Sequence, residues 1–405
     1  MEKEITSIES NQRIQVLDQL RGFALLLIFL MNLPALSRIS FHYTDTLIPA
    51  LRDDSVLTNF LLHLLRLLFE NSSRPLFAFM FGISMVLIYD NVKRRGKNPF
   101  FTLFRRMFVL MLIGYIHFSF IWHGDILLMY ALAGFILLLF ISMSAWPLLL
   151  FTLLSTLLFN EMQSGILMYI DEESFNLSEG IQFNITHMIK NLFWWGTDYS
   201  FDSNPIVKKL LYQFQFVLPH LFFFLAGMLA YRLNIFGRLP RYRVAGWMIA
   251  IVLLAAGIYG KKRILDIETS FWALDNENLI NFSVSLGIAF VIILMSSSRR
   301  MSILTRPFAA VGRMAFTNYL LQSLVFVSIF IPSGESFFRD HGLINQMPYT
   351  ILLLLSLIFF GLQMWGSHIW LRHFHYGPFE WLWRWGTNLK LPPMRRKLPA
   401  AKENT

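Results

Sequence analysis

Apolar runs of about 20 residues recur along this chain and constrain its fold more than any other feature. The first run, Val16–Asn32, has the charged residues Asp18 and Arg21 near its start and a polar Asn at its end. A helix of about 20 residues, rising about 1.5 Å per residue, is long enough to cross a hydrocarbon layer of about 30 Å. Because a soluble fold has no place for so many helices that are apolar on every side, we expect an all-α polytopic membrane protein.

The composition agrees with a membrane location. Of the 405 residues, 55% are hydrophobic and 15% are charged, whereas soluble proteins have about 25% charged residues. There is no cysteine, which excludes a thiolate metal site, and no metal site of another kind is expected. We attribute the net charge of +10 to Lys and Arg in cytoplasmic loops, so no nucleic-acid partner is expected.

Ten transmembrane helices are predicted, all within one integral membrane domain that covers residues 1–405. Their approximate ranges are 20–39, 75–91, 101–121, 125–143, 146–169, 208–231, 244–261, 279–296, 308–331 and 349–371. A shorter segment, Val56–Phe69, is predicted to be an amphipathic helix on the membrane surface, because His63 and Arg66 interrupt its Leu-rich sequence.

The loop charges predict which side of the membrane each loop faces. Lys and Arg gather between spans two and three, six and seven, and eight and nine, and in the C-terminal tail. All of these segments fall on one side of a ten-span chain. On the other side, residues 161–206 contain seven acidic residues and one lysine. By the positive-inside rule, both termini are therefore expected in the cytoplasm.

A few polar side chains are predicted to lie at similar depth in the outer half of the membrane. They are Asn32 in span one, His117 and Asp125 at the hairpin between spans three and four, and Asn318 and Gln322 in span nine. Asn318 and Gln322 are four residues apart and therefore share one helical face. Polar groups inside a membrane often mark a functional site.

An imidazole beside a carboxylate can accept and return a proton near neutral pH, which acyl transfer to a hydroxyl or an amine requires. His117, Asp125 and Asn32 are therefore the candidate catalytic residues, and an amide could polarise the acyl carbonyl. The alternative is structural, because membrane amides often only join helices and His117 with Asp125 could only pin two helices together.

Other polar residues are candidates for substrate binding. Asp18 and Arg21 are one helical turn apart at the inner end of span one and are expected to pair. Arg74 begins span two, and His42 lies in the outer loop after span one, where it could reach back over the site. The candidate substrate-binding residues are Asp18, Arg21, Arg74, Asn318, Gln322 and His42.

Six runs between residues 16 and 387 carry a resemblance that covers almost the whole chain. They are LDQLRGFALLLIFLMN, LFAFMFGIS, GYIHFSFIWHGDILLMYALAG, LAGMLAYR, VGRMAFTNYLLQS and YGPFEWLWRWGT. Together they resemble the YeiB family of bacterial inner-membrane proteins, whose C-terminal half is domain of unknown function 418. The resemblance implies a location in the bacterial cytoplasmic membrane and YeiB-type helices over residues 232–390.

The opening LDQLRG, followed by an apolar span, is also similar to transmembrane acyltransferases of the acyltransferase-3 and heparan-α-glucosaminide N-acetyltransferase types. Those proteins move an acyl group from cytoplasmic acyl-CoA to a lumenal or periplasmic acceptor. An Asn in span one and a His in the following loop, implicated in the site of the latter enzyme, match Asn32 and His42. The similarity implies acyltransferase-like helices over residues 20–231, with acyl-CoA as the donor substrate.

Three classes of function remain open. The first is a membrane-bound acyltransferase that uses cytoplasmic acyl-CoA and an exported envelope acceptor and is surrounded by membrane lipid. The alternative is a transporter or lipid-handling protein whose polar groups line a route, although we find no internal repeat and few charges within the spans. The third is a structural membrane partner without chemistry, and a homodimer is left open.

Overall fold

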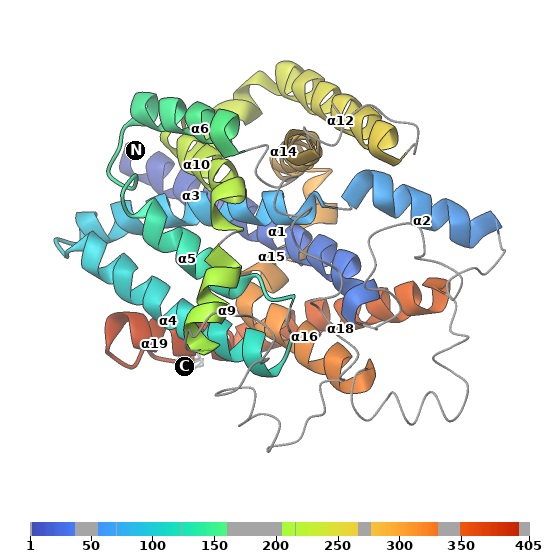
Figure 1. Ribbon diagram of the computed structural model, residues 1–405. Helices are drawn as coiled ribbons and strands as arrows, with labels where there is room; N and C mark the ends of the chain where they lie inside the picture. Colours follow the sequence, from blue (N-terminus) through green and yellow to red (C-terminus); the bar gives the residue numbers. More distant parts are fainter. Residues whose placement is uncertain are drawn as a thin grey trace, which may run out of the picture.

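The computed structural model describes residues 2–36, 56–69, 71–122, 124–159, 205–214, 216–265, 277–330 and 349–396. Within these residues the chain is helical and has no strand apart from one isolated bridge between Phe374 and Arg395. The helices pack into one bundle that is drawn in Figure 1.

The helices that the structure describes follow this order along the chain. They are α1 (Glu2–Leu36), α2 (Val56–Phe69), α3 (Ser73–Arg94), α4 (Pro99–Phe120), α5 (Leu127–Leu137), α6 (Ala145–Phe159), α9 (Pro205–Phe214), α10 (Val217–Arg232), α11 (Ile235–Arg238), η2 (Leu239–Tyr242), α12 (Arg243–Leu265), α14 (Glu277–Ser296), α15 (Ser302–Arg313), α16 (Ala315–Phe330), α18 (Tyr349–His373) and α19 (Pro378–Asn388).

The apolar helices agree with a membrane protein. Six of the described helical segments are long and apolar enough to cross a membrane, and four more apolar helices are shorter. Helices α12 and α18 also expose large apolar side chains, such as Val244 and Leu362, which a helix in contact with lipid can do without cost. The number of ten crossings and the side on which the termini lie stay predictions.

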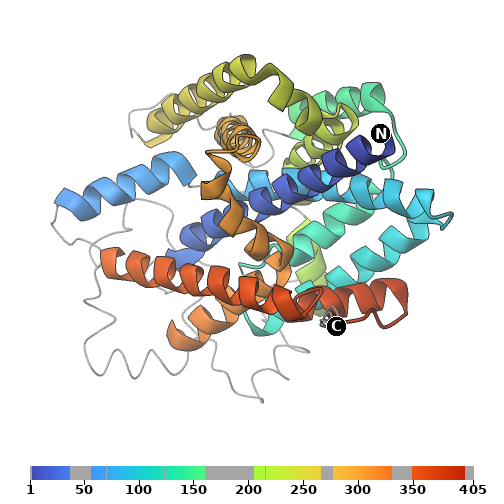
Figure 2. The ribbon, with the colours of Figure 1, turned by 180° about the vertical axis from the view of Figure 1, so that it is seen from behind.

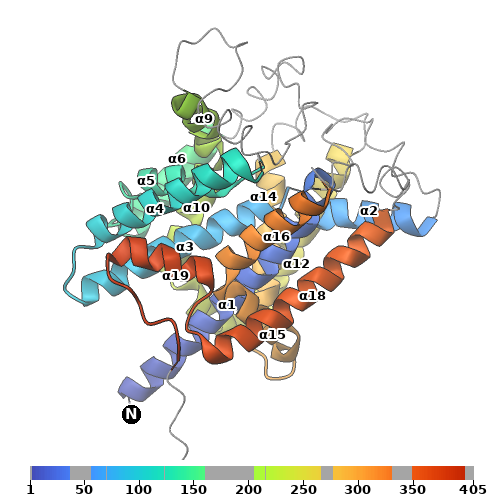
Figure 3. The ribbon, with the colours of Figure 1, turned by 90° about the horizontal axis from the view of Figure 1, so that it is seen from below.

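Helix α1 passes through the middle of the bundle. Figures 1 and 2 show it between α12 and α14 on one side and α18 on the other, and it packs against α3, α14, α15, α16 and α18. Helix α1 begins at Glu2, well before the predicted residue 20. Figure 3 shows its N-terminal end at one end of the bundle.

Helices α1 and α15 touch backbone to backbone. A Cβ atom on Gly22 would lie 2.0 Å from the carbonyl oxygen of Phe308, and one on Gly312 would lie 1.8 Å from that of Asp18. Because no real Cβ can approach so closely, only glycine fits at these two positions. Close helix packing of this kind is typical of membrane proteins.

Two predicted spans are each divided in the structure. The predicted span 308–331 contains the end of α15 and all of α16, and the division falls at Met314. Glu380 of α19 stabilises the start of α16, because its carboxylate accepts hydrogen bonds from the backbone N–H groups of Phe316 (2.7 Å) and Thr317 (3.0 Å). These are N–H groups of the first turn of α16, which have no partner within the helix.

The predicted span 208–231 is likewise divided, into α9 and α10. Pro219 lies in the first turn of α10. Proline has no N–H to donate to a preceding turn, so a helix more readily begins just before it than continues through it. Helix α9 is therefore separate from the apolar helix α10.

The segment Val56–Phe69 forms a helix with the predicted bounds, while its position on the membrane surface stays a prediction. Helix α19 was not predicted as an element. It lies against α4, where the Trp383 side chain donates a hydrogen bond to the carbonyl of Arg106 (2.9 Å).

Candidate functional site

The candidate site lies where α4 ends and the chain turns into α5. His117 is in the last turn of α4, and its carbonyl accepts the N–H groups of Ile121 and Trp122, both at 2.9 Å, which closes the turn. A Cβ on Gly114 would lie 2.5 Å from the backbone nitrogen of Leu128, so this glycine allows α4 and α5 to approach closely.

This turn brings His117 and Asp125 side by side. Their Nδ1 and Oδ1 atoms are 2.8 Å apart, and the two side chains are only 1% and 0% exposed. The other carboxylate oxygen, Oδ2, accepts the N–H of Leu128 at 2.8 Å. Asp125 is therefore held by the backbone at the start of α5 through one oxygen, and its second oxygen faces the imidazole.

The imidazole of His117 retains hydrogen-bonding capacity. Its Nε2 atom is buried and has no hydrogen-bond partner among the described residues, and the contact between Nδ1 and Oδ1 is close but not aligned as a hydrogen bond. A buried polar nitrogen normally has a partner, because leaving it without one costs free energy. The Nε2 atom therefore lacks, within the described residues, the partner that a buried nitrogen normally has.

A tyrosine that was not predicted completes this site. The ring of Tyr319 in α16 lies beside the imidazole, with 5.4 Å between ring centroids. Its hydroxyl oxygen is 3.4 Å from the backbone N–H of Ile126, which donates to it. The hydroxyl proton of Tyr319 is thus available for a further acceptor.

Asn318 and Gln322 face a different helix. The amide nitrogen of Asn318 donates to Ser367 Oγ in α18 at 2.9 Å, and that of Gln322 donates to Gln363 Oε1 at 2.9 Å. The Gln363 amide nitrogen in turn donates to the carbonyl of Asn318 at 3.0 Å. These contacts agree with the structural alternative, in which the amides join α16 to α18.

The structure does not place Asn32 at the level of His117. Contacts advance in the same direction along α1 and along α15–α16, because Gly22 meets Phe308 and the Phe29 ring packs against Phe326 at 4.8 Å between centroids. Asn32 is three residues beyond Phe29, and Phe326 is seven beyond Tyr319, which contacts His117. Asn32 therefore lies about ten residues, or about 15 Å along the helix, past that contact, and it is partly exposed.

The predicted pair at the start of the first span is present. Arg21 Nη1 is 2.9 Å from Asp18 Oδ1, and Arg21 Nη2 donates to Ser84 Oγ in α3 at 2.6 Å. Arg74 is exposed at the start of α3, and its carbonyl accepts the Tyr130 hydroxyl of α5 at 3.0 Å. His42 lies outside the described residues.

A second residue that was not predicted is Lys209 in α9. Its ammonium group is buried, donates to Ser119 Oγ at 3.1 Å and lies 5.6 Å from the centroid of the Tyr115 ring. Ser119 follows His117 by two residues, so Lys209 brings a basic group to the end of α4. Within the described residues, no three His, Cys, Asp or Glu side chains are grouped as metal ligands would be.

Residues 230–390 match the family described as "Protein of unknown function (DUF418)". The chain is 30% identical over 418 residues to "Uncharacterized protein YxaH" of Bacillus subtilis, covering 96% of this chain and 97% of that protein. It is 28% identical over 415 residues to an uncharacterized 39.9 kDa protein of Bacillus acidopullulyticus, covering 96% and 98%.

A shorter stretch of 76 residues is 43% identical to "Uncharacterized protein YeiB" of Escherichia coli, covering 19% of this chain and 18% of that protein. The two Bacillus proteins align over nearly their whole lengths, so the similarity is not confined to residues 230–390. None of these descriptions states an activity.

Proposed function

The chain belongs to the YeiB/DUF418 family, and we propose from its own site that it is a membrane-bound acyltransferase. It moves an acyl group from cytoplasmic acyl-CoA to an exported envelope acceptor across the bacterial cytoplasmic membrane. The observation that supports this proposal is the buried contact between His117 and Asp125, with Nε2 of the imidazole left for a reacting group.

In this reaction His117 is the general base and then the general acid. Its Nε2 takes the proton from the acceptor hydroxyl or amine while the acceptor oxygen or nitrogen bonds to the acyl carbon. The carbon–sulfur bond of the thioester breaks, and the proton passes from Nε2 to the departing sulfur of coenzyme A. Atoms and charges balance without a further reactant.

Asp125 and Tyr319 assist this exchange. The Asp125 carboxylate, fixed by the Leu128 N–H, orients the imidazole and stabilises its protonated form through Nδ1. Tyr319 offers its hydroxyl proton beside the imidazole, where it can stabilise the negative charge that develops on the acyl oxygen. The donor is proposed to enter from the cytoplasm near Arg21 and the basic loops.

The test uses the purified full chain in lipid vesicles, with radiolabelled acetyl-CoA and longer acyl-CoAs supplied on the side that Lys97 faces. A bacterial envelope extract supplies the acceptor on the other side. We expect label in the extract, and we expect His117→Gln and Asp125→Asn to lower the transfer rate at least about 100-fold. The released coenzyme A thiol is measured in parallel.

The control is His220→Gln, which removes another buried imidazole. His220 lies in α10, where its Nδ1 is 2.8 Å from the carbonyl of Phe216, and it has no part in the proposed reaction. Its variant should keep the transfer rate within about threefold of the parent. A folded His117→Ala protein that transfers acyl groups at the full rate contradicts the proposal.

The transporter alternative gives a different result in the same vesicles. A transporter or lipid-handling protein moves its substrate without breaking the thioester, so it would release no coenzyme A thiol. Label would then cross the membrane in the compound that was supplied.

A further inference from the structure

A cavity of about 550 Å³ opens at the end of the bundle that the loop charges predict to be cytoplasmic. It lies between the N-terminal part of α1, the segment α11–η2 and the turn from α14 to α15. Its size is within the range of small-molecule sites, about 300–1,000 Å³. Neither His117 nor Arg21 is among its lining residues.

The lining of this cavity carries charge of one sign. Four arginines and four serines are among its fifteen lining residues, and none of the fifteen is acidic. The arginines are Arg241, Arg243, Arg299 and Arg306. Four positive charges around one cavity repel one another, so an anion between them lowers the electrostatic free energy.

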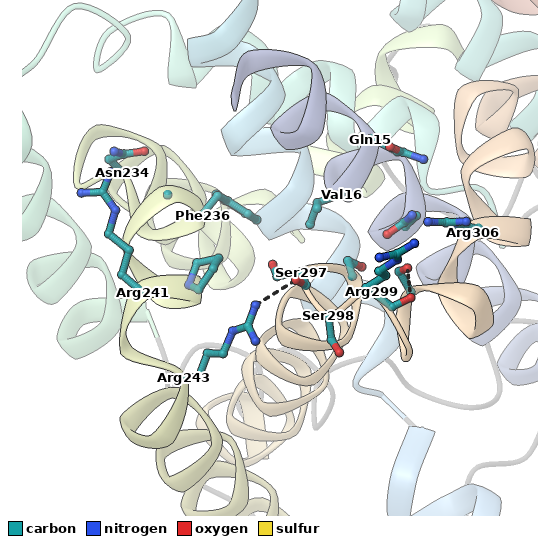
Figure 4. A pocket seen from close by; sticks show the side chains of 15 residues that line it. Gln15, Val16, Asn234, Phe236, Arg241, Arg243, Ser297, Ser298, Arg299 and Arg306 are labelled. Carbon is teal, nitrogen blue, oxygen red and sulfur yellow. Dashed lines mark hydrogen bonds between the residues drawn. The ribbon is translucent and has the colours of Figure 1, made fainter. Parts of the chain in front are cut away.

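The arginines come from two opposite walls. Figure 4 shows Arg241 and Arg243 on one side of the cavity and Arg299 and Arg306 on the other. The two walls are linked at Arg243, whose Nη2 donates to the carbonyl of Ser297 at 3.0 Å. The fold thus places arginines that are more than 50 residues apart in the chain around the same cavity.

These arginines retain capacity for a ligand. Arg243, Arg299 and Arg306 form no ion pair with any residue that the structure describes, and all three side chains are exposed to whatever enters the cavity. A guanidinium group presents a planar fork of N–H donors that matches the oxygens of a phosphate. The Ser298 hydroxyl, also in the lining, can add a neutral donor.

We propose that this cavity binds a ligand that carries phosphate groups. A bias of positive residues toward the cytoplasm explains Arg in these loops, but it does not require four of them to surround one cavity from which acidic residues are missing. Two sources offer the right chemistry: a soluble diphosphate such as the nucleotide end of coenzyme A, and the headgroup of an anionic phospholipid.

The experiment measures binding to the purified full chain in nanodiscs of zwitterionic phosphatidylcholine. The probes are inorganic pyrophosphate, coenzyme A without an acyl group, and a soluble short-chain phosphatidylglycerol. Dissociation constants are measured by calorimetry at low and high salt. We expect at least one probe to bind, and to bind more weakly at high salt because salt screens the arginines.

The variant Arg243→Gln/Arg306→Gln removes one charge from each wall and should raise the dissociation constant at least tenfold. The control is Arg300→Gln, because Arg300 is exposed in the same turn as Arg299 but does not line the cavity. Its dissociation constant should stay within twofold of the parent.

Binding of pyrophosphate and coenzyme A identifies a soluble ligand, and binding of the phosphatidylglycerol alone identifies a lipid headgroup. The inference is overturned if no probe binds, or if the Arg300 control loses as much affinity as the double variant.

The inference does not depend on acyl transfer, and the two are separated by measuring binding in the His117→Gln protein. If the His117→Gln protein still binds the probes and also transfers acyl groups at the normal rate, the acyltransferase proposal is contradicted. The phosphate site then stands without it. Normal acyl transfer by the parent protein, together with no binding of any probe to it, gives the reverse result: the phosphate site is overturned and the acyltransferase proposal stands.

Discussion

The two ring nitrogens of His117 have different surroundings, and this difference sets what the residue can do. Nδ1 faces the Asp125 carboxylate at 2.8 Å, while Nε2 has no partner within the described part of the chain. The spacing of the two residues in one short hairpin was enough to predict their contact. Tyr319 was not predicted, because a tyrosine in an apolar helix has no pattern that tells which neighbour it meets.

At the residue scale, Tyr319→Phe tests the proposed role of the hydroxyl. The variant keeps the ring beside His117 and loses only the oxygen that accepts the Ile126 N–H. We expect acyl transfer to fall about tenfold or more, with a loss of stability of no more than about 1 kcal/mol, since that hydrogen bond is long. An unchanged transfer rate would show that Tyr319 only packs against the imidazole.

Asn318→Ala tests the opposite assignment for a predicted substrate-binding residue. It leaves Ser367 without its partner in α16, so we expect a loss of stability of about 1–2 kcal/mol, measured by unfolding in detergent. Leu321→Ala, at an exposed position of the same helix, should cost less. A tenfold loss of acyl transfer in a stable Asn318→Ala protein would favour the predicted substrate-binding role of Asn318 over the structural one.

At the scale of elements, close contacts between helices determine how the candidate site is assembled. Helix α15 is held against α1 at Gly22 and Gly312 and ends with Met314 as its C-cap, directly before α16 begins. Glu380 of α19 satisfies the first N–H groups of α16. The direction of α16, and with it the position of Tyr319, therefore depends on both contacts.

Gly312→Ala tests this dependence. Its new Cβ would lie 1.8 Å from the carbonyl oxygen of Asp18 and 2.8 Å from the backbone nitrogen of Gly22, so α1 and α15 must separate. We expect a loss of stability of about 2 kcal/mol or more, measured as a lower unfolding midpoint. Gly361→Ala in α18 is the control, because its Cβ would meet nothing within 4 Å and alanine favours a helix.

At the scale of the whole molecule, the described helices form one bundle with α1 at its centre, and the loop charges predict the orientation of that bundle in the membrane. The arginine-lined cavity and the His117 site lie in different parts of this bundle, and no residue is shared between them. If the chain is oriented as the loop charges predict, the cavity faces the cytoplasm and His117 lies toward the other face, and the proposed transfer across the membrane requires such an arrangement.

The orientation is tested with single cysteines, since the chain has none of its own. We expect Lys97→Cys, in the exposed turn after α3, to react with a membrane-impermeant thiol reagent only after the cells are opened. Asp198→Cys, in the acidic segment 161–206, should react in intact cells. Labelling of Lys97→Cys in intact cells would show that the chain is inserted the other way round.

The sequence by itself determined what depends on nearby residues. Apolar length predicted the helices, and spacing predicted the contacts of Asp18 with Arg21 and of His117 with Asp125, because both pairs lie within one turn or one hairpin. Only the tertiary structure decided what depends on distant residues. Such contacts are Tyr319 beside His117, Asn318 toward Ser367, Glu380 at the start of α16 and the arginines around one cavity. Helical periodicity gives the faces of each helix, but the choice of the neighbour that each face meets is made by packing the whole bundle at once.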